Sequence, residues 1–376
     1  WSPFISKVAT ITAVINSMVS LKKYSENKLE PQLINVAGEW DTYEEELKSE
    51  NIKIINLTKY KFLKNKNYNG FLKSRFIYFL ICIVSFFPLK NLLKRDNPKY
   101  LIIHLITPLP LILRSIFKFK TKFILRISGF PQLEKSFIRF FFWKIFTKKL
   151  EYITCPTIHT CKFIQSFNFL NNEKVKVIYD PILNLKKIIK KKNEKTKDIF
   201  FSKEFFVAIG RLTKQKNFYN LIKSFDKFNK SKKYQVIIIG EGENKKILQN
   251  KIDQLNASSD IILLGYQKNV FNILKKSKCF ILSSLWEDPG FVLIEAAFSN
   301  KLIISSNCKN GPEEILDYGN NGILYKSNDD NDLIKALNKL ENMDQNVKHK
   351  LLLNSKIITK KYTLFSHYKG ISKILL

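Results

Sequence analysis

The chain has 376 residues, of which 45% are hydrophobic, enough to fill the cores of two domains of ordinary size. Its 64 Lys and Arg against 32 Asp and Glu give a formal net charge of +32. The five cysteines are scattered and form no CxxC pair, which argues against a disulfide framework and for a reducing compartment. These properties indicate a globular, cytosolic protein.

The positive charge is concentrated in one part of the chain. Between Lys59 and Lys149 there are twenty basic residues and two acidic ones, Asp96 and Glu134. Such a segment favours an anionic, phosphate-rich partner. Nucleic acid is one alternative, but the sequence has no recognition module, and its aromatic residues lie in apolar runs rather than between the cations.

The first half alternates apolar runs with amphipathic stretches, which predicts parallel strands flanked by helices. The chain opens at Trp1 with the helical pattern "SPFISKVATITAVINSM", which lacks the strand expected before it. We therefore expect a short N-terminal strand to be missing from this sequence. The predicted strands of this half are residues 31–38, 52–57, 100–106, 122–128, 151–157 and 174–180.

The longest apolar run, "FIYFLICIVSFFPL" at residues 76–89, has 14 residues. A helix needs about 20 apolar residues to cross a bilayer, so this run is predicted not to span one. Lys73 and Arg75 precede it, and Lys90, Lys94 and Arg95 follow it. A helix at a membrane interface and a buried core helix both fit this pattern.

The charged segment 185–204 has no apolar face and is predicted to be a linker. We expect an N-terminal domain at 1–184, a C-terminal domain at 205–360, and a last helix at 361–376 that packs back on the N-terminal domain. In such doubly wound α/β domains, ligands bind at the carboxyl ends of the strands. The predicted strands of the second half are residues 205–210, 234–240, 260–265, 279–284, 302–306 and 322–325.

Two loops of the second half carry candidate phosphate-binding residues. "VAIGRLTKQKN" places Arg211 and Lys216 after a strand. Arg211 is one of only six arginines in a chain that otherwise uses lysine, which favours a planar, bidentate contact with an anion, although a surface loop with ordinary cations explains it equally well. "IIIGEGE" brings Gly240 to the end of the next strand, where a close ligand or a plain tight turn explains it equally well.

The stretch "SLWEDPGFVLIEA" joins a buried strand to a helix that begins near Gly290. The unpaired amides at this helix start, at Gly290, Phe291 and Val292, can bind a diphosphate. Glu295 lies about one turn inside the helix, where a carboxylate can accept both hydroxyls of a ribose. Glu287, in the loop before the helix, can accept hydroxyls of a sugar beyond the phosphates.

Glu287 and Glu295 with seven residues between them, together with "GRLTKQKN", "IIIGEGE" and "GPEEIL" (311–316), resemble the family 4 retaining glycosyltransferases of the GT-B fold. The resemblance covers about residues 203–340. It implies two Rossmann-like doubly wound parallel-sheet domains facing across a cleft, and transfer of a sugar from a nucleoside-diphosphate sugar with retention and without a metal or other cofactor. It also implies that Arg211 and Lys216 hold the diphosphate, Glu295 the ribose and Glu287 the donor sugar.

The sequence departs from the family pattern in two places. "EDPG" stands where many members have Glu-Gly-Phe-Gly, and "RISGFP", with Arg126 and Ser128, stands where many carry a histidine. No carboxylate is placed as a nucleophile, so we expect front-face attack in which the leaving diphosphate accepts the acceptor's proton. Glu287, Arg211 and Lys216 are the predicted catalytic residues. A nucleotide-sugar epimerase of the same architecture is an alternative.

In the GT-B arrangement the N-terminal domain binds the acceptor. The basic segment 59–149 and the aromatic run 137–146 suit docking on an anionic leaflet. The sequence therefore predicts a lipid-linked or growing surface polysaccharide as acceptor, and a peripheral location at the cytoplasmic face of the plasma membrane. The resemblance implies an enzyme of bacterial surface-polysaccharide assembly, such as capsule or lipopolysaccharide biosynthesis.

Three polar motifs are interpreted as structural. "NDDND" at 328–332 precedes an amphipathic helix and is predicted to cap it rather than to hold a metal. "CPTIHTC", with Cys155, His159 and Cys161, offers three metal ligands at best and has no second cluster. His104 is a lone histidine beside an apolar strand and is also interpreted as structural.

Overall fold

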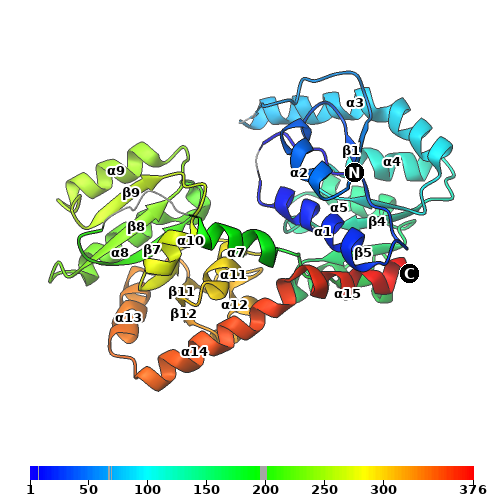
Figure 1. Cartoon of the computed structure of the whole chain (residues 1–376). Coiled ribbons are helices and arrows are strands. Elements are labelled where there is room, and N and C mark those ends of the chain that lie inside the picture. The colour runs from blue at the N-terminus through cyan, green and yellow to red at the C-terminus, as the bar shows by residue number, and fades with distance from the viewer. Residues whose placement is uncertain (7, 67, 69, 195–200) are drawn as a thin grey trace. The chain divides into compact units, whose positions relative to one another are not determined.

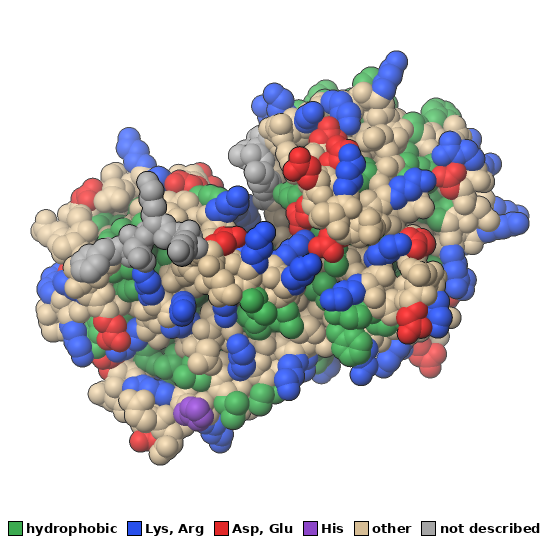
Figure 2. All heavy atoms as spheres, viewed as in Figure 1, with side chains coloured by type: hydrophobic (Ala, Val, Ile, Leu, Met, Phe, Trp, Pro, Cys, Tyr) green, Lys and Arg blue, Asp and Glu red, His purple; other side chains and the backbone are tan. Residues whose placement is uncertain are grey.

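The computed structural model describes residues 1–376 except 7, 67, 69 and 195–200 (Figure 1). The chain divides into two compact units. Unit 1 comprises Trp1–Ile182 and Leu364–Leu376, and unit 2 comprises Leu183–Thr363. Lysine and arginine side chains are scattered over the visible surface of each unit (Figure 2).

The parallel sheet of unit 1 has the strand order β3-β4-β5-β6. Strands β1 and β2 form a separate parallel pair in the same unit. All six strands predicted for the first half are confirmed. Their bounds are β1 Gln32–Asn35, β2 Lys53–Asn56, β3 Tyr100–Ile103, β4 Lys122–Arg126, β5 Tyr152–Cys155 and β6 Val175–Val177.

Trp1 lies beside the free edge of β3. Its amino group donates a hydrogen bond to Ile102 O at 2.9 Å, and the His104 N–H donates one to Trp1 O at 2.8 Å. The helical pattern that opens the sequence begins later than predicted, at Thr10. The helices of unit 1 are α1 Thr10–Tyr24, α2 Glu44–Ser49, α3 Phe71–Asp96, α4 Pro108–Ile116, α5 Phe137–Phe146, α6 Ile158–Gln165 and α15 Leu364–Leu375.

The last helix, α15, packs along α1 within unit 1 (Figure 1). The Ser17 hydroxyl and His367 Nε2 are 2.8 Å apart, and the Ser20 hydroxyl donates to Leu364 O at 2.9 Å. Ile371 and Ile374 of α15 join the buried cluster that contains Ile124 of β4. Unit 1 is therefore built from both ends of the chain.

Helix α3 is longer than the sequence predicted. The apolar run 76–89 is only its middle part, because the helix has 26 residues. The segment Leu72–Asp96 is long and apolar enough to cross a membrane, with a mean hydropathy of 2.0 in its most apolar window. One third of that window is nevertheless buried inside the protein. Polar residues at both ends continue the helix instead of ending it, so the 14-residue length of the apolar run does not by itself exclude a span.

Unit 2 is built on a sheet with strand order β12-β11-β10-β7-β8-β9, and every pairing is parallel. All six strands predicted for the second half are confirmed. Strands β8 and β10 are buried along their whole length, as expected for central parallel strands. The bounds are β7 Glu204–Ile209, β8 Tyr234–Ile239, β9 Ile261–Gly265, β10 Cys279–Leu282, β11 Leu302–Ser306 and β12 Ile323–Tyr325.

The predicted linker at 185–204 needs a correction. Residues Leu185–Asn193 form helix α7, and Ile188 is buried, so this segment has the apolar contact that the sequence pattern did not show. Residues 195–200 of the predicted linker lie outside the described residues. The other helices of unit 2 are α8 Phe218–Phe228, α9 Lys245–Gln254, α10 Phe271–Lys276, α11 Phe291–Phe298, α12 Pro312–Ile315, α13 Asp330–Glu341 and α14 Gln345–Ile358.

Candidate functional site

The predicted donor-site residues gather at the carboxyl ends of β7, β8 and β10, which are next to one another or one strand apart in the sheet. Hydrogen bonds tie the loop after β7 to the loop after β10. The Ser283 hydroxyl donates to Lys216 O at 2.7 Å, and the Leu285 N–H donates to Gln215 O at 2.8 Å. The two loops therefore form one connected surface.

Lys216 and Glu287 form a largely buried ion pair within this surface. Lys216 Nζ lies 2.5 Å from Glu287 Oε1, and the two side chains are 13% and 5% exposed. The Ser284 hydroxyl donates to the same carboxylate oxygen at 2.5 Å. The sequence predicted that Lys216 faces the diphosphate and Glu287 the sugar, whereas in the structure these side chains face each other.

The lysine of this pair is positioned by a glycine. The aliphatic part of the Lys216 side chain lies so close to Gly210 that a Cβ at Gly210 would come within 3.0 Å of it. An ammonium group has three protons, and Glu287 accepts one of them. Lys216 can therefore serve the carboxylate and an anionic ligand together.

Arg211 is exposed at the start of the same loop. Within the described part of the chain, no hydrogen bond or ion pair engages its guanidinium. Its planar fork of donors is thus open to solvent, as a bidentate contact with a phosphate requires.

Gly240 lets two loops approach each other closely. Its φ is +148°, and a Cβ there would lie 1.9 Å from Gly210 O. The Gly210 N–H donates to Ile239 O at 2.9 Å, and the Gly240 N–H to Gly265 O at 3.0 Å. The tight approach between backbones is therefore sufficient to explain this glycine, without a ligand.

Helix α11 begins beside the ion pair. Gly290 stands before its first turn with a φ of +94°, and the Cγ of Glu287 is 3.4 Å from the position of a Cβ at Gly290. Phe291 and Val292 occupy the first turn and are partly exposed. The first amides of a helix have no intrahelical acceptor and carry positive potential, which suits an anion.

The loop before α11 is held by a residue that the sequence analysis missed. Asn310, which follows β11, donates from its side-chain amide to Asp288 Oδ1 at 2.6 Å and to Glu287 O at 3.3 Å. Gly311 packs against Pro289, since a Cβ at Gly311 would lie 1.8 Å from Pro289 O. The "NGP" sequence just before the acidic "EEIL" was the available signal.

Glu295 lies on the partly exposed face of α11 that also carries Phe291 and Val292, while Leu293, Ile294, Ala296 and Ala297 face the core. Desolvation raises the pKa of the Glu295 carboxyl to about 7, and the charge of Lys191 on α7 opposes that rise. Among the described residues, no hydrogen-bond donor satisfies this carboxylate. It is therefore suited to receive donors from a ligand.

The motifs interpreted as structural have structural contacts. Asp329 caps α13 by accepting hydrogen bonds from the Asn331 and Asp332 amides, both at 3.1 Å, which confirms the capping prediction. Cys155 and Cys161 are buried thiols, and a hydrogen bond with Cys161 raises the pKa of Cys155. In the ranges that the structure describes, no three His, Cys, Asp or Glu side chains are grouped as metal ligands.

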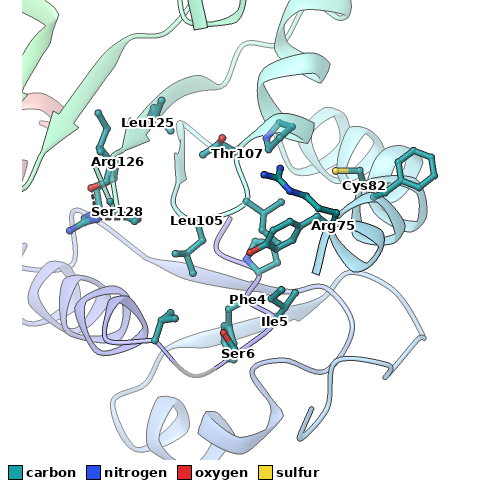
Figure 3. A pocket seen from close by; sticks show the side chains of 18 of the residues that line it. Phe4, Ile5, Ser6, Arg75, Cys82, Leu105, Thr107, Leu125, Arg126 and Ser128 are labelled. Atoms are coloured by element: carbon teal, nitrogen blue, oxygen red, sulfur yellow. Dashed lines mark hydrogen bonds between the residues drawn. The ribbon is translucent and has the colours of Figure 1, made fainter. Parts of the chain in front are cut away.

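Unit 1 contains a cavity that the sequence analysis did not predict. It has a volume of about 630 Å³ and lies at the carboxyl ends of β3 and β4 (Figure 3). Arg126 and Ser128, noted above for standing where many relatives carry a histidine, both line it. His104, close to Arg126, is buried, and burial lowers its pKa well below the usual value.

Comparison with known proteins agrees with this architecture. Residues 188–356 match the family model described as Glycosyl transferases group 1. WaaB, a lipopolysaccharide outer core galactosyltransferase, superposes with a TM-score of 0.70 at 17% identity, covering 100% of this chain and 97% of its own. Anabaena HepE in complex with UDP gives 0.71 at 14% identity, covering 100% and 98%. The chain thus has the GT-B fold, with two Rossmann-like units.

Curated relatives are similar over about half of the chain. An uncharacterized glycosyltransferase of Methanocaldococcus jannaschii is 39% identical over 222 residues, which are 55% of this chain and 53% of the relative. The N-acetylgalactosamine-N,N'-diacetylbacillosaminyl-diphospho-undecaprenol 4-alpha-N-acetylgalactosaminyltransferase of Campylobacter jejuni is 28% identical over 174 residues, 46% of each protein. The chain matches these relatives over about half of their length.

Proposed function

We propose that this protein is a retaining glycosyltransferase that moves a sugar from a nucleoside-diphosphate sugar to a lipid-linked or growing surface polysaccharide. The observation that carries the proposal is the buried Lys216–Glu287 pair at the start of α11, with Arg211 exposed in the same loop. Cations and helix amides in one place are what a leaving diphosphate needs. The relatives and structural neighbours named above support the same assignment.

We propose the following roles, which combine the observed contacts with the family resemblance. Arg211, Lys216 and the α11 amides at Gly290, Phe291 and Val292 bind the diphosphate and stabilise the charge that develops on it. Glu295 accepts the ribose hydroxyls, and Glu287 orients Lys216 and contacts the donor sugar. Attack occurs on the face that the diphosphate leaves, and the diphosphate oxygen takes the acceptor's proton. No step in this scheme requires a metal ion.

A lipid-linked acceptor is part of the proposal because the named Campylobacter relative acts on a diphospho-undecaprenol-linked saccharide. Helix α3 adds an independent observation. Five apolar side chains along one of its faces are each between 54% and 80% exposed: Leu72, Phe76, Phe79, Ile83 and Phe87. Phe137, Ile138 and Phe141 of α5 are also more than half exposed.

The opposite face of α3 belongs to the core of unit 1. Ile77, Ile81, Leu89 and Leu92 are buried there. A helix with one face in the core cannot cross a bilayer without exposing that core, so α3 docks in the plane of the membrane surface. The cations around the exposed stripe, such as Lys73, Lys90 and Lys94, favour anionic lipids. We therefore place the protein at the cytoplasmic face of the plasma membrane.

Acceptor-dependent release of nucleotide tests the reaction. Purified protein is incubated with labelled nucleotide sugars, with and without a polyprenyl-diphosphate-linked monosaccharide. Transfer predicts nucleotide release that requires the acceptor and a product with the donor's anomeric configuration. An isomerised donor sugar without release would show an epimerase instead.

Vesicle sedimentation tests the docking face. We expect the protein to pellet with phosphatidylglycerol vesicles at low salt and less at high salt. Phe76→Ser with Phe87→Ser should abolish pelleting, whereas Ile247→Ser with Leu353→Ser, two exposed apolar residues of unit 2, should not. Equal pelleting of both double variants would refute the assignment of α3.

A further inference from the structure

The cavity of unit 1 has a predominantly apolar wall. It lies between α3, the loops after β3 and β4, and the N-terminal segment (Figure 3). Its apolar lining comprises Phe4, Tyr78, Phe79, Leu105, Ile106 and Trp143. Phe79 is also 64% exposed and belongs to the stripe along α3, so the cavity wall continues directly into the proposed docking face.

The polar part of the cavity is small and positively charged. Arg75 extends from α3 toward Thr107, and Ser128 lies on the opposite side next to Arg126 (Figure 3). None of the described residues that line the cavity is Asp or Glu. The charge of Arg126 is paired with Asp180, so Arg75 supplies the positive charge of the lining. An apolar wall with this cation and few other polar groups fits an amphipathic anion better than a free sugar.

Ser128 is positioned by Arg126, which belongs to a buried ion pair with Asp180. Arg126 pairs with Asp180, and both side chains are almost fully buried. Arg126 Nη1 also donates hydrogen bonds to Ser128 Oγ at 3.1 Å and to Ile127 O at 2.7 Å. Ser128 itself remains partly exposed at the cavity.

This arrangement fixes the direction in which Ser128 can donate. Because Oγ already accepts a hydrogen bond from a cation, its own proton must point elsewhere. Among the residues that the structure describes, no acceptor takes that proton. A hydroxyl polarised by a guanidinium is a good donor to an anionic oxygen.

We propose that this cavity binds the acceptor as a lipid diphosphate, with the lipid chain against Phe79 and Trp143 and a phosphate oxygen accepting a hydrogen bond from Ser128. Arg126 is the positioning residue for Ser128, and Arg75 contributes charge at the far side. This inference rests on the proposed transfer to a lipid-linked acceptor and names the residues that recognise it.

Binding of farnesyl diphosphate, measured by calorimetry on the full chain, tests the inference. We expect wild type to bind it more tightly than farnesol or inorganic diphosphate. Ser128→Ala should weaken binding about tenfold or more, since a hydrogen bond to a charged group is lost. Ser128→Thr should retain it, and Ser166→Ala, which removes a hydroxyl elsewhere in unit 1, should leave it unchanged.

Alkylation of Cys82 gives a second readout without any variant. Cys82 lines the cavity and is half-buried, whereas the four other cysteines are buried. Farnesyl diphosphate should slow its reaction with N-ethylmaleimide about fivefold, and inorganic diphosphate should not. Unprotected Cys82, or equal affinity of Ser128→Ala and wild type, would overturn the cavity assignment. Either result would leave the proposed transfer reaction standing, because acceptor-dependent nucleotide release tests that reaction separately.

Discussion

Lys216 and Glu287 are 71 positions apart in the chain, yet Lys216 Nζ lies 2.5 Å from Glu287 Oε1. They meet because β7 and β10 are neighbours in the sheet and each residue follows one of these strands. The carboxylate neutralises the lysine when no ligand is bound, and the remaining ammonium protons stay available. The pair therefore keeps a cation buried at the proposed diphosphate site at a moderate electrostatic cost.

Replacing one member of this pair should affect stability and activity differently. Lys216→Met leaves the carboxylate of Glu287 buried without a partner, so we expect unfolding free energy to fall by about 3 kcal/mol. Adding Glu287→Gln should restore more than half of that loss, since the stranded charge is gone. Activity should stay at least about a hundredfold down in both variants.

Urea unfolding and nucleotide-release kinetics measure the two effects. Lys214→Met, on the same loop but exposed, is the matched control and should resemble wild type. If the double variant recovered activity along with stability, the pair would be structural only.

Arg211 should matter for activity alone. Arg211→Ala removes an exposed side chain, so the melting temperature should change by no more than a degree or two, while kcat/KM for transfer should drop about a hundredfold. Arg211→Lys should be intermediate, because it keeps the charge but loses the bidentate geometry. Near-wild-type turnover of Arg211→Ala would remove its proposed role.

Glu295 predicts a pH dependence of donor binding. Its carboxyl has a pKa of about 7, and ribose hydroxyls need the ionised form as acceptor. The KM for the donor should therefore fall as pH rises from 6 to 8. The Glu295→Gln variant should show a higher KM with no such trend. Steady-state kinetics at constant ionic strength provides the measurement.

The raised pKa of Glu295 also predicts that the stability of the protein depends on pH. A higher pH should favour donor binding but lower the unfolding free energy. The folded pKa of about 7 lies above the ordinary value of 4.5, so the folded chain holds the proton more tightly than the unfolded chain. As the pH rises from about 4.5 to 7, the unfolding free energy of wild type should fall relative to that of Glu295→Gln. Above pH 7 the difference between the two proteins should stay constant. If the unfolding free energy of wild type instead rose with pH relative to that of Glu295→Gln, the raised pKa would be contradicted.

Gly240 should tolerate no side chain. In Gly240→Ala the new Cβ would meet Gly210 O at 1.9 Å in a backbone conformation that is also unfavourable, so we expect a loss of at least about 3 kcal/mol. Gly319→Ala is the control, because its φ is +105° but nothing lies within 4 Å of the added Cβ. It should cost only about 1 kcal/mol. Thermal unfolding of both variants compares them.

The strands could be predicted because central parallel strands are apolar on both faces and read as continuous runs of Ile, Val, Leu and Phe. Helix α3 was predicted too short, because polar residues interrupt the apolar pattern at both of its ends, although Leu92 and Leu93 near its C-terminal end are still buried in the core. The buried face of α7 was missed for a similar reason, since Ile188 is a single apolar contact within a lysine-rich segment.

Pairings across the fold could not be predicted. The sequence predicted Arg211, Lys216, Glu287 and Glu295 as site residues, and their roles stay predictions. It could not predict that Lys216 faces Glu287, because that depends on which strands are neighbours. The support of Ser128 by Arg126 and Asp180 likewise joins the ends of two different strands. The carboxylate is 54 positions beyond the arginine in the chain, where no local pattern connects them.

The packing of α15 in unit 1 has a consequence for anyone who wishes to produce that unit separately. A gene fragment that stops at Ile182 would leave the flank of α1 uncovered and should yield insoluble protein. The Leu183 N–H donates to Tyr362 O at 3.0 Å, so the two points at which the chain leaves and re-enters unit 1 are neighbours. Topologically, unit 2 is an insertion, and a short glycine bridge from Ile182 to Leu364 should give a soluble, independently folding half.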